Sequence, residues 1–128
     1  LEFSTEEDFP EVQGDSRALY RAILNLVKNA FEAFKNKPDA CIKVFARLVD
    51  SERYEVSVQD NGAGMPDEVK VRLFETFFST KGKRGTGLGL MVVSRTVNMH
   101  RGTVAVESQP GVGTKFTLTL PRIFKKTE

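Results

Sequence analysis

The sequence is poor in the residues that mark several other classes of protein. It holds one cysteine, Cys41, and one histidine, His100, which excludes an internal disulfide and a Cys/His zinc cluster. A lone cysteine suits a reducing compartment, so a cytoplasmic location is expected. No apolar run approaches the roughly 20 residues that a membrane-spanning helix needs, and no signal peptide is visible. No membrane contact is expected of this domain, and a membrane sensor of a parent protein would lie outside the chain.

A large excess of either charge is also missing. The formal net charge is +2, and the basic residues are scattered rather than gathered on one face, so nucleic-acid binding is not expected. Repeats and low-complexity tracts are absent as well. With 40% hydrophobic and 28% charged residues, the composition is that of an ordinary globular protein. We therefore expect residues 1–128 to form one domain, which is long enough to bury a core.

Two stretches carry apolar residues at helical spacing. The first runs from Asp15 to Lys35, with Asp15 as the predicted N-cap and residues 36–39 as the stop signal. The second begins near Thr86, and a shorter helix is expected from about Asp67. The residues expected on the inner side of the second long helix are Leu88, Met91, Val92, Arg95, Thr96 and Met99.

Between and after these helices, apolar residues alternate with polar ones. This pattern predicts strands over 42–48, 54–58, 104–106 and 116–120, with 1–5 as an added edge strand. Short turn sequences join the strands into two hairpins. The predicted fold class is α+β: a two-layer sandwich in which about three helices cover one face of a mixed, mostly antiparallel sheet.

Two asparagines on the first helix are candidates for ligand binding. Asn25 and Asn29 are four residues apart and therefore share a face of the helix. Their amide oxygens suit a hard cation such as Mg²⁺, and their N–H groups suit phosphate. Taken alone, the pair is more simply explained as two exposed polar positions.

A second candidate is the segment Asp60-Asn61-Gly62-Ala63-Gly64, which directly follows a predicted strand. An aspartate at the end of a strand presents a carboxylate, and the glycines beyond it let the backbone approach a planar ligand. A carboxylate accepts a hydrogen bond from an exocyclic amine, which selects adenine over guanine. The alternative is a plain Asp-Asn-Gly turn.

The segment Gly85-Thr86-Gly87-Leu88-Gly89-Leu90 opens the second long helix. Glycines at that position let free backbone N–H groups approach phosphate oxygens. The spacing matches neither the dinucleotide fingerprint nor the P-loop. Just before it, the aromatic-rich stretch 74–78 gives way to a short basic segment in which Lys81, Lys83 or Arg84 could neutralise a γ-phosphate.

Together and in this order, these motifs resemble the catalytic domain of sensor histidine kinases, over about Glu11 to Pro121. That family has an N box, a first glycine box, an F box, a second glycine box and a closing strand motif. The matching segments are residues 25–30, 60–66, 74–81, 85–90 and 111–116. Thr76 stands where the F box often has proline. The very short lid between Lys81 and Gly85 resembles that of kinases of the nitrogen-regulation type.

The resemblance implies a Bergerat ATP-binding fold, shared with gyrase, mismatch-repair ATPases and large heat-shock chaperones, with ATP and Mg²⁺ as cofactors. It makes Asn29 a Mg²⁺ ligand and Asp60 the residue that binds the adenine amine. Thr114 would help Asp60 through water, and Gly62 and Gly64 would shape the adenine pocket. The other ATP-binding residues that it implies are Asn25, Lys81, Gly85, Thr86, Gly87, Leu88 and Gly89.

Position 25 separates the branches of that superfamily. Hydrolytic members are similar in carrying glutamate four residues before the magnesium asparagine, but here the residue is Asn25. An amide oxygen binds a proton too weakly to act as a general base. The expected activity is therefore histidine kinase rather than ATPase. A slow ATPase, or a nucleotide-sensing module without transfer activity, remains an alternative.

The phosphoacceptor histidine of that family lies on a dimerising helical hairpin, and no such segment occurs in these 128 residues. His100 ends the second long helix, and we expect it to be structural, with Gly102 as the C-cap. The expected partners are the dimerisation and phosphoacceptor domain of the same kinase and, indirectly, a response regulator. No catalytic residue is expected within the chain itself.

Overall fold

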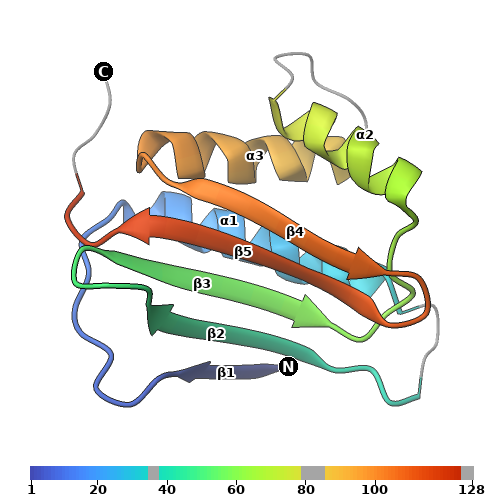
Figure 1. The fold of residues 1–128 in the computed structure, drawn as a ribbon, viewed down its shortest axis with the longest axis horizontal. Coiled ribbons are helices and arrows are strands. Elements are labelled where there is room, and N and C mark those ends of the chain that lie inside the picture. The colour runs from blue at the N-terminus through green and yellow to red at the C-terminus, as the bar shows by residue number, and fades with distance from the viewer. Residues whose placement is uncertain (35–37, 79–85, 125–128) are drawn as a thin grey trace.

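The computed structural model describes residues 1–34, 38–78 and 86–124, and for 74–78 and 86–89 only the backbone. Five strands form a single sheet (Figure 1). They are β1 (Glu2–Thr5), β2 (Ile42–Leu48), β3 (Arg53–Asp60), β4 (Thr103–Gln109) and β5 (Gly113–Pro121). The strand order is β1-β2-β3-β5-β4. Only the β1–β2 pair is parallel, and the other three pairs are antiparallel.

Three helices complete the described part of the chain: α1 (Ser16–Glu32), α2 (Asp67–Phe78) and α3 (Thr86–Met99). The two long helices, α1 and α3, lie side by side on the same face of the sheet, and α2 lies next to α3 (Figure 1). This arrangement confirms the predicted α+β class with a mixed, mostly antiparallel sheet. None of the described helices is long and apolar enough to cross a membrane.

The core lies between the sheet and the two long helices. Strand alternation places one side chain in two on the helix-facing side, so Val58 of β3 and its partner Phe116 of β5 are both buried. On the other face, Gln59 is exposed. The buried apolar side chains are Ala22, Leu26, Val27, Ala30, Ile42, Val44, Tyr54, Val58, Leu90, Val93, Val97, Phe116, Leu118 and Leu120.

Helix α1 begins where the sequence predicts. The Asp15 side chain accepts a hydrogen bond from the Ala18 backbone N–H at 3.1 Å, which is the N-cap contact that satisfies one of the free donors of the first turn. The helix ends at Glu32, slightly before the expected Lys35. The buried side chains of α1, which are Ala22, Leu26, Val27 and Ala30, pack into the core and so fix the position of Asn25 and Asn29 relative to the sheet.

The predicted inner side of α3 is wrong in part. Thr96 is buried as predicted, but Arg95 is exposed and Met91, Val92 and Met99 are only half-buried. The buried apolar residues of the helix are Leu90, Val93 and Val97. Apolar residues occur on almost every side of this helix, so the sequence pattern alone does not identify the face that packs against α1.

The predicted end of α3 needs a correction as well. The residue with positive φ is Arg101, at 60°, and not Gly102. Gly102 N–H donates to Val97 O at 2.8 Å and Arg101 N–H donates to Asn98 O at 3.0 Å, the pair of bonds that defines a Schellman ending. Gly102 is required for a different reason: a Cβ there would lie 2.3 Å from Thr119 O.

His100 is 1% exposed and is held by the backbone on both sides of its ring. Its Nε2 accepts the Asp15 N–H at 3.0 Å, and its Nδ1 lies 2.7 Å from Thr96 O. Since Thr96 O can only accept, Nδ1 carries the hydrogen. His100 thus joins the end of α3 to the start of α1, in agreement with the structural role predicted for it.

Candidate functional site

Asp60 is the last residue of β3, and its side chain lies on the helix-facing side of the sheet at 8% exposure. Its Oδ1 accepts hydrogen bonds from the Gly62 N–H at 2.8 Å and the Thr114 N–H at 3.3 Å. Its Oδ2 accepts none from the described residues. Because no fully buried polar side-chain atom among them lacks a partner, Oδ2 is at least partly exposed. One carboxylate oxygen is therefore fixed and the other is available to a ligand.

Burial sets the ionisation of this carboxyl. Removal from water raises the pKa of Asp60 above its ordinary value, and the hydrogen bonds from the Gly62 and Thr114 backbone oppose part of that rise. A partly desolvated carboxylate forms stronger hydrogen bonds to a ligand donor than one in water.

Two loops meet beside Asp60. The Gly111 N–H donates to Ala63 O at 2.7 Å, and the Met65 N–H donates to Ser108 Oγ at 2.8 Å. Gly64 lies between these contacts with φ +70°, and a Cβ on it would meet Gln109 O at 1.9 Å. No other residue fits this position, because both the left-handed backbone and the close approach require glycine.

Gly62 is needed for packing. A Cβ there would lie 2.9 Å from both Ala33 Cβ and Ala33 O, at the end of α1. The Ala63 N–H donates to the same Ala33 carbonyl at 3.2 Å. The loop after β3 is thereby fixed against α1, the helix that carries Asn29.

A cavity of about 220 Å³ opens between the end of α1, the sheet and α2. Asp60 and Thr114 form its polar corner, and Asn29 and Glu32 line the α1 side. Apolar walls with a few convergent polar groups are typical of sites for small molecules. The residues that line this cavity are Asn29, Glu32, Ala33, Asp60, Gly64, Met65, Leu73, Thr114 and Phe116.

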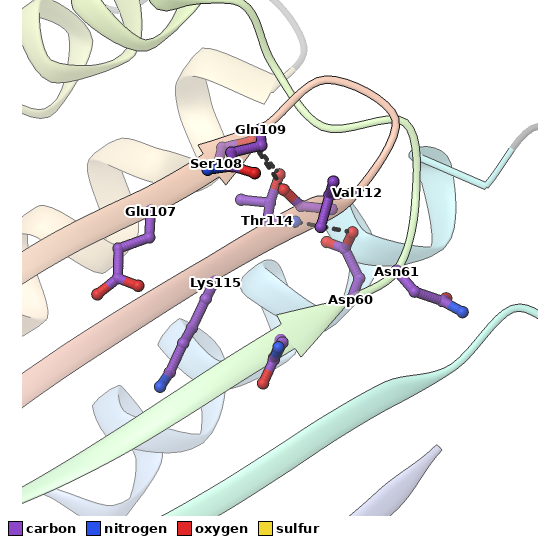
Figure 2. Close-up of a pocket in the computed structure, with 10 residues that line it drawn as sticks. Asp60, Asn61, Glu107, Ser108, Gln109, Val112, Thr114 and Lys115 are labelled. Carbon is purple, nitrogen blue, oxygen red and sulfur yellow. Dashed lines mark hydrogen bonds between the residues drawn. The ribbon is translucent and has the colours of Figure 1, made fainter.

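A second cavity, of about 250 Å³, lies against the other side of the same strand ends. Figure 2 shows this one, with Asp60, Thr114 and Ser108 side by side at the ends of β3, β5 and β4. Asp60 and Thr114 line both cavities, but here their neighbours include the charged Glu107 and Lys115. The cavity on the helix side, with Met65, Leu73 and Phe116 in its walls, suits a planar base better.

The structure brings several of the predicted ligand-binding residues together. Asn29, Asp60, Gly64 and Thr114 line one cavity, although they come from distant parts of the sequence. Gly62 borders it through its hydrogen bond to Asp60. Asn25 lies one turn before Asn29, is half-buried, and is not among the residues that line this cavity.

The predicted phosphate-binding segment is described only in part. The backbone of Thr86, Gly87, Leu88 and Gly89 forms the first turn of α3, as expected for free N–H groups at a helix start. Gly85, Lys81, Lys83 and Arg84 lie outside the described residues.

Sequence reasoning missed two features of the site. Leu73 of α2 lines the cavity, but its helical spacing alone predicts only a contact with the core. Ser108 is buried and bonds to Met65 and Thr114. The alternation of β4, which places Val104 and Val106 on the helix-facing side, would have placed Ser108 there too.

Residues 14–123 match the family described as "Histidine kinase-, DNA gyrase B-, and HSP90-like ATPase". The chain belongs to this family. The match covers both long helices, all strands except β1, and each segment that forms the cavity.

Known relatives and solved structures point to one branch of the family. Sporulation kinase E of Bacillus subtilis (strain 168) is 36% identical over 115 residues, which is 90% of this chain and 15% of that protein. The catalytic domain of histidine kinase ThkA superposes with a TM-score of 0.77 at 27% identity, covering 95% of this chain and 79% of that one. Full-length ShkA in complex with AMPPNP gives a TM-score of 0.79 at 28% identity, covering 98% of this chain and 26% of that one. The chain thus spans a small part of the full-length kinases that it resembles.

Proposed function

We propose that this chain binds Mg-ATP and presents the γ-phosphoryl group for transfer to a histidine on a separate dimerisation and phosphoacceptor domain, in two-component signal transduction. The observation that carries the proposal is Asp60, whose Oδ2 has no hydrogen-bond partner among the described residues, at the polar corner of a cavity with apolar walls. An exocyclic amine on a flat base satisfies that oxygen, and Met65 and Phe116 line the space beside it.

The other residues have separate tasks in this proposal. Asn29, which lines the same cavity, offers an amide oxygen of the kind that Mg²⁺ accepts as a ligand. A bound Mg²⁺ would neutralise phosphate charge as the γ-phosphoryl group leaves. Thr114 supports the base, and Gly62 and Gly64 hold the loop that borders it. The glycines 85, 87 and 89 and Lys81 complete the proposed phosphate site.

The nucleophile comes from the other domain. In the transfer, a histidine ring nitrogen forms a bond to the γ-phosphorus, the bond to the bridging β–γ oxygen breaks, and ADP leaves. Such a reaction relies mainly on positioning and charge stabilisation. Asn25 cannot serve as a general base, so water is not activated from that position. We propose accordingly that residues 1–128 act as one ATP-binding catalytic domain that reaches a response regulator only indirectly.

Substitution of Asp60 tests the nucleotide site. In Asp60→Asn, the amide oxygen can replace Oδ1, but the NH₂ group then faces the adenine amine. Both groups are hydrogen-bond donors, so the bond to the base is lost. We expect the affinity for Mg-ATP, measured by titration calorimetry, to fall by roughly 100-fold or more, because charge-assisted hydrogen bonds are the strong ones.

Asp50→Asn provides a matched control for that experiment. Asp50 is exposed, makes turn hydrogen bonds to the Glu52 and Arg53 backbone, and lies just before β3, at the opposite end of the strand from Asp60. Its substitution should leave ATP affinity unchanged. Equal affinity in the wild type and a folded Asp60→Asn variant would overturn the proposed base site.

Transfer itself requires a partner. Mixing the chain with the phosphoacceptor hairpin of a homologous kinase and γ-labelled ATP should place label on the hairpin histidine, and Asp60→Asn should prevent it. Binding of ATP with no labelled hairpin would favour a nucleotide-sensing module instead. The cytoplasmic location and the short-lid, nitrogen-regulation subtype stay predictions.

A further inference from the structure

Ser108 occupies a hydrogen-bonding centre between the two loops of the site. It is buried near the end of β4, and its register partner on β5 is Thr114. Its Oγ accepts the Met65 N–H at 2.8 Å, donates to Gly113 O at 3.0 Å, and lies 2.8 Å from Thr114 Oγ1. Figure 2 shows Ser108 and Thr114 in contact beside Asp60.

A count of hydrogens fixes the direction of the Ser108–Thr114 bond. A serine hydroxyl has one hydrogen to donate and two lone pairs that accept. Gly113 O only accepts, so it takes the Ser108 hydrogen, and the Met65 N–H takes one lone pair. All three bonds form together only if Thr114 donates its own hydrogen to the remaining lone pair of Ser108.

This direction determines what Thr114 offers to a ligand. With its hydrogen committed to Ser108, Thr114 Oγ1 has only lone pairs left. Asp60, its direct register partner on β3, offers the lone pairs of Oδ2. The corner that these two side chains form therefore contains acceptors and no side-chain donor. It suits an amino group, whereas an oxo group there would meet two acceptors.

We propose that Ser108 is a positioning residue for base selection: by accepting the Thr114 hydrogen, it keeps Thr114 an acceptor, and the corner then selects a 6-amino purine nucleotide over a 6-oxo one. This inference rests on the proposed function, which places the base at Asp60. Ser108 itself acts on the base only through Thr114.

The test compares ATP with inosine triphosphate, in which an oxo group replaces the amino group. Dissociation constants are measured by calorimetry on the whole chain, and the readout is the ratio of the inosine triphosphate value to the ATP value. A general loss of packing weakens the binding of both nucleotides alike, so it cancels in this ratio. In Ser108→Ala, the Thr114 hydroxyl is free to turn and donate to the oxo group. The ratio should then fall by roughly fivefold, as one ordinary hydrogen bond gives.

Three further variants test whether Ser108 acts on the base through Thr114. Ser108→Thr keeps the hydroxyl and should keep the wild-type ratio. Thr114→Val removes the opposing acceptor and should lower the ratio, a result that does not depend on whether Ser108→Ala folds. In a Thr114→Val background, Ser108→Ala should have no additional effect on the ratio.

The possible failures are distinct. A rise of the ratio in Thr114→Val would show that Thr114 donates to the base, which overturns the inference. The same holds for an unchanged ratio in a folded Ser108→Ala variant, or for an equal effect of that substitution with and without the Thr114 hydroxyl. Equal wild-type affinity for the two nucleotides would instead overturn the placement of the base at Asp60.

Discussion

Asp60 holds a negative charge in a place where burial opposes it. Removal from water raises the pKa of its carboxyl, and two backbone N–H groups offset only part of that effect. A folded chain that binds the proton more tightly than the unfolded chain loses stability as the pH rises from the ordinary aspartate value through the raised one. Ionised Asp60 thus costs the folded protein stability at neutral pH, and ligand binding is what would compensate for it.

This cost can be measured without nucleotide. Asp60→Asn removes the charge, so we expect its melting temperature at neutral pH to equal or exceed that of the wild type. The difference should shrink as the pH falls through the raised pKa of Asp60 towards 3.8, the ordinary aspartate value, and should be lost below it, because the wild-type carboxyl is then protonated in both states. Thermal denaturation of both proteins across this range provides the measurement. A variant that melts well below the wild type at neutral pH would contradict the expectation.

At the level of elements, the contact between the two loops depends on Gly64. Gly64 and Gly111 both have positive φ, +70° and +79°. A Cβ on Gly64 would meet Gln109 O, whereas a Cβ on Gly111 would have nothing within 4 Å. The two positions share the backbone requirement and differ in the space around them.

The pair gives a controlled prediction. Gly111→Ala should cost about 1 kcal/mol, the ordinary penalty for a left-handed alanine. Gly64→Ala should cost more than about 3 kcal/mol, because the loops must also separate. Urea denaturation of the two variants gives both values. Equal costs would mean that the contact with Gln109 contributes nothing to stability.

The sequence predicts the elements better than it predicts their faces. Period-two alternation located β2, β3, β4 and β5, because a sheet that is covered by helices on one face alternates apolar and polar residues along each strand. Helix α3 carries apolar residues on nearly every side, so its buried face followed only from the packing of Leu90, Val93 and Val97. The requirement for glycine at position 102, just after α3, comes from the close approach of Thr119 O of β5, which is a tertiary contact that the local pattern does not show.

The same limit applies to the candidate site. Asp60 and Asn29 stand at recognisable positions in a strand and a helix, whereas Thr114 follows only from the family resemblance. The alternation of β4 places Ser108 on the helix-facing side, but no motif marks it, and a serine in an edge strand is ordinary until its partners are known. Its assignment required the distances to Met65, Gly113 and Thr114.

At the scale of the whole molecule, the proposal that the phosphoacceptor histidine lies on another domain predicts that this chain binds ATP without transferring its phosphoryl group. The 128-residue chain should bind Mg-ATP, yet γ-labelled ATP should leave no stable label on it, and phosphate release should be slow. The reasons are that Asn25 is no base and that His100, with both ring nitrogens engaged by the backbone, is buried. Gel autoradiography and a phosphate-release assay are the measurements. Stable label on the isolated chain would refute the expectation.

Apart from the edge strand β1, the sheet consists of two local hairpins, β2–β3 and β4–β5, joined along β3 and β5. Asp60 and Thr114 face each other across that seam although they are 54 residues apart in the sequence. Each hairpin closes a short loop, whereas the seam must bring distant segments together, which is the slower step in folding. The corner formed by Asp60 and Thr114 exists only once β3 and β5 have paired. A nucleotide would therefore bind the folded chain and not the unfolded one. At 100 times its Kd, such a ligand adds about 2.7 kcal/mol to the free energy of unfolding, so the supply of nucleotide would also set how much of the chain stays folded.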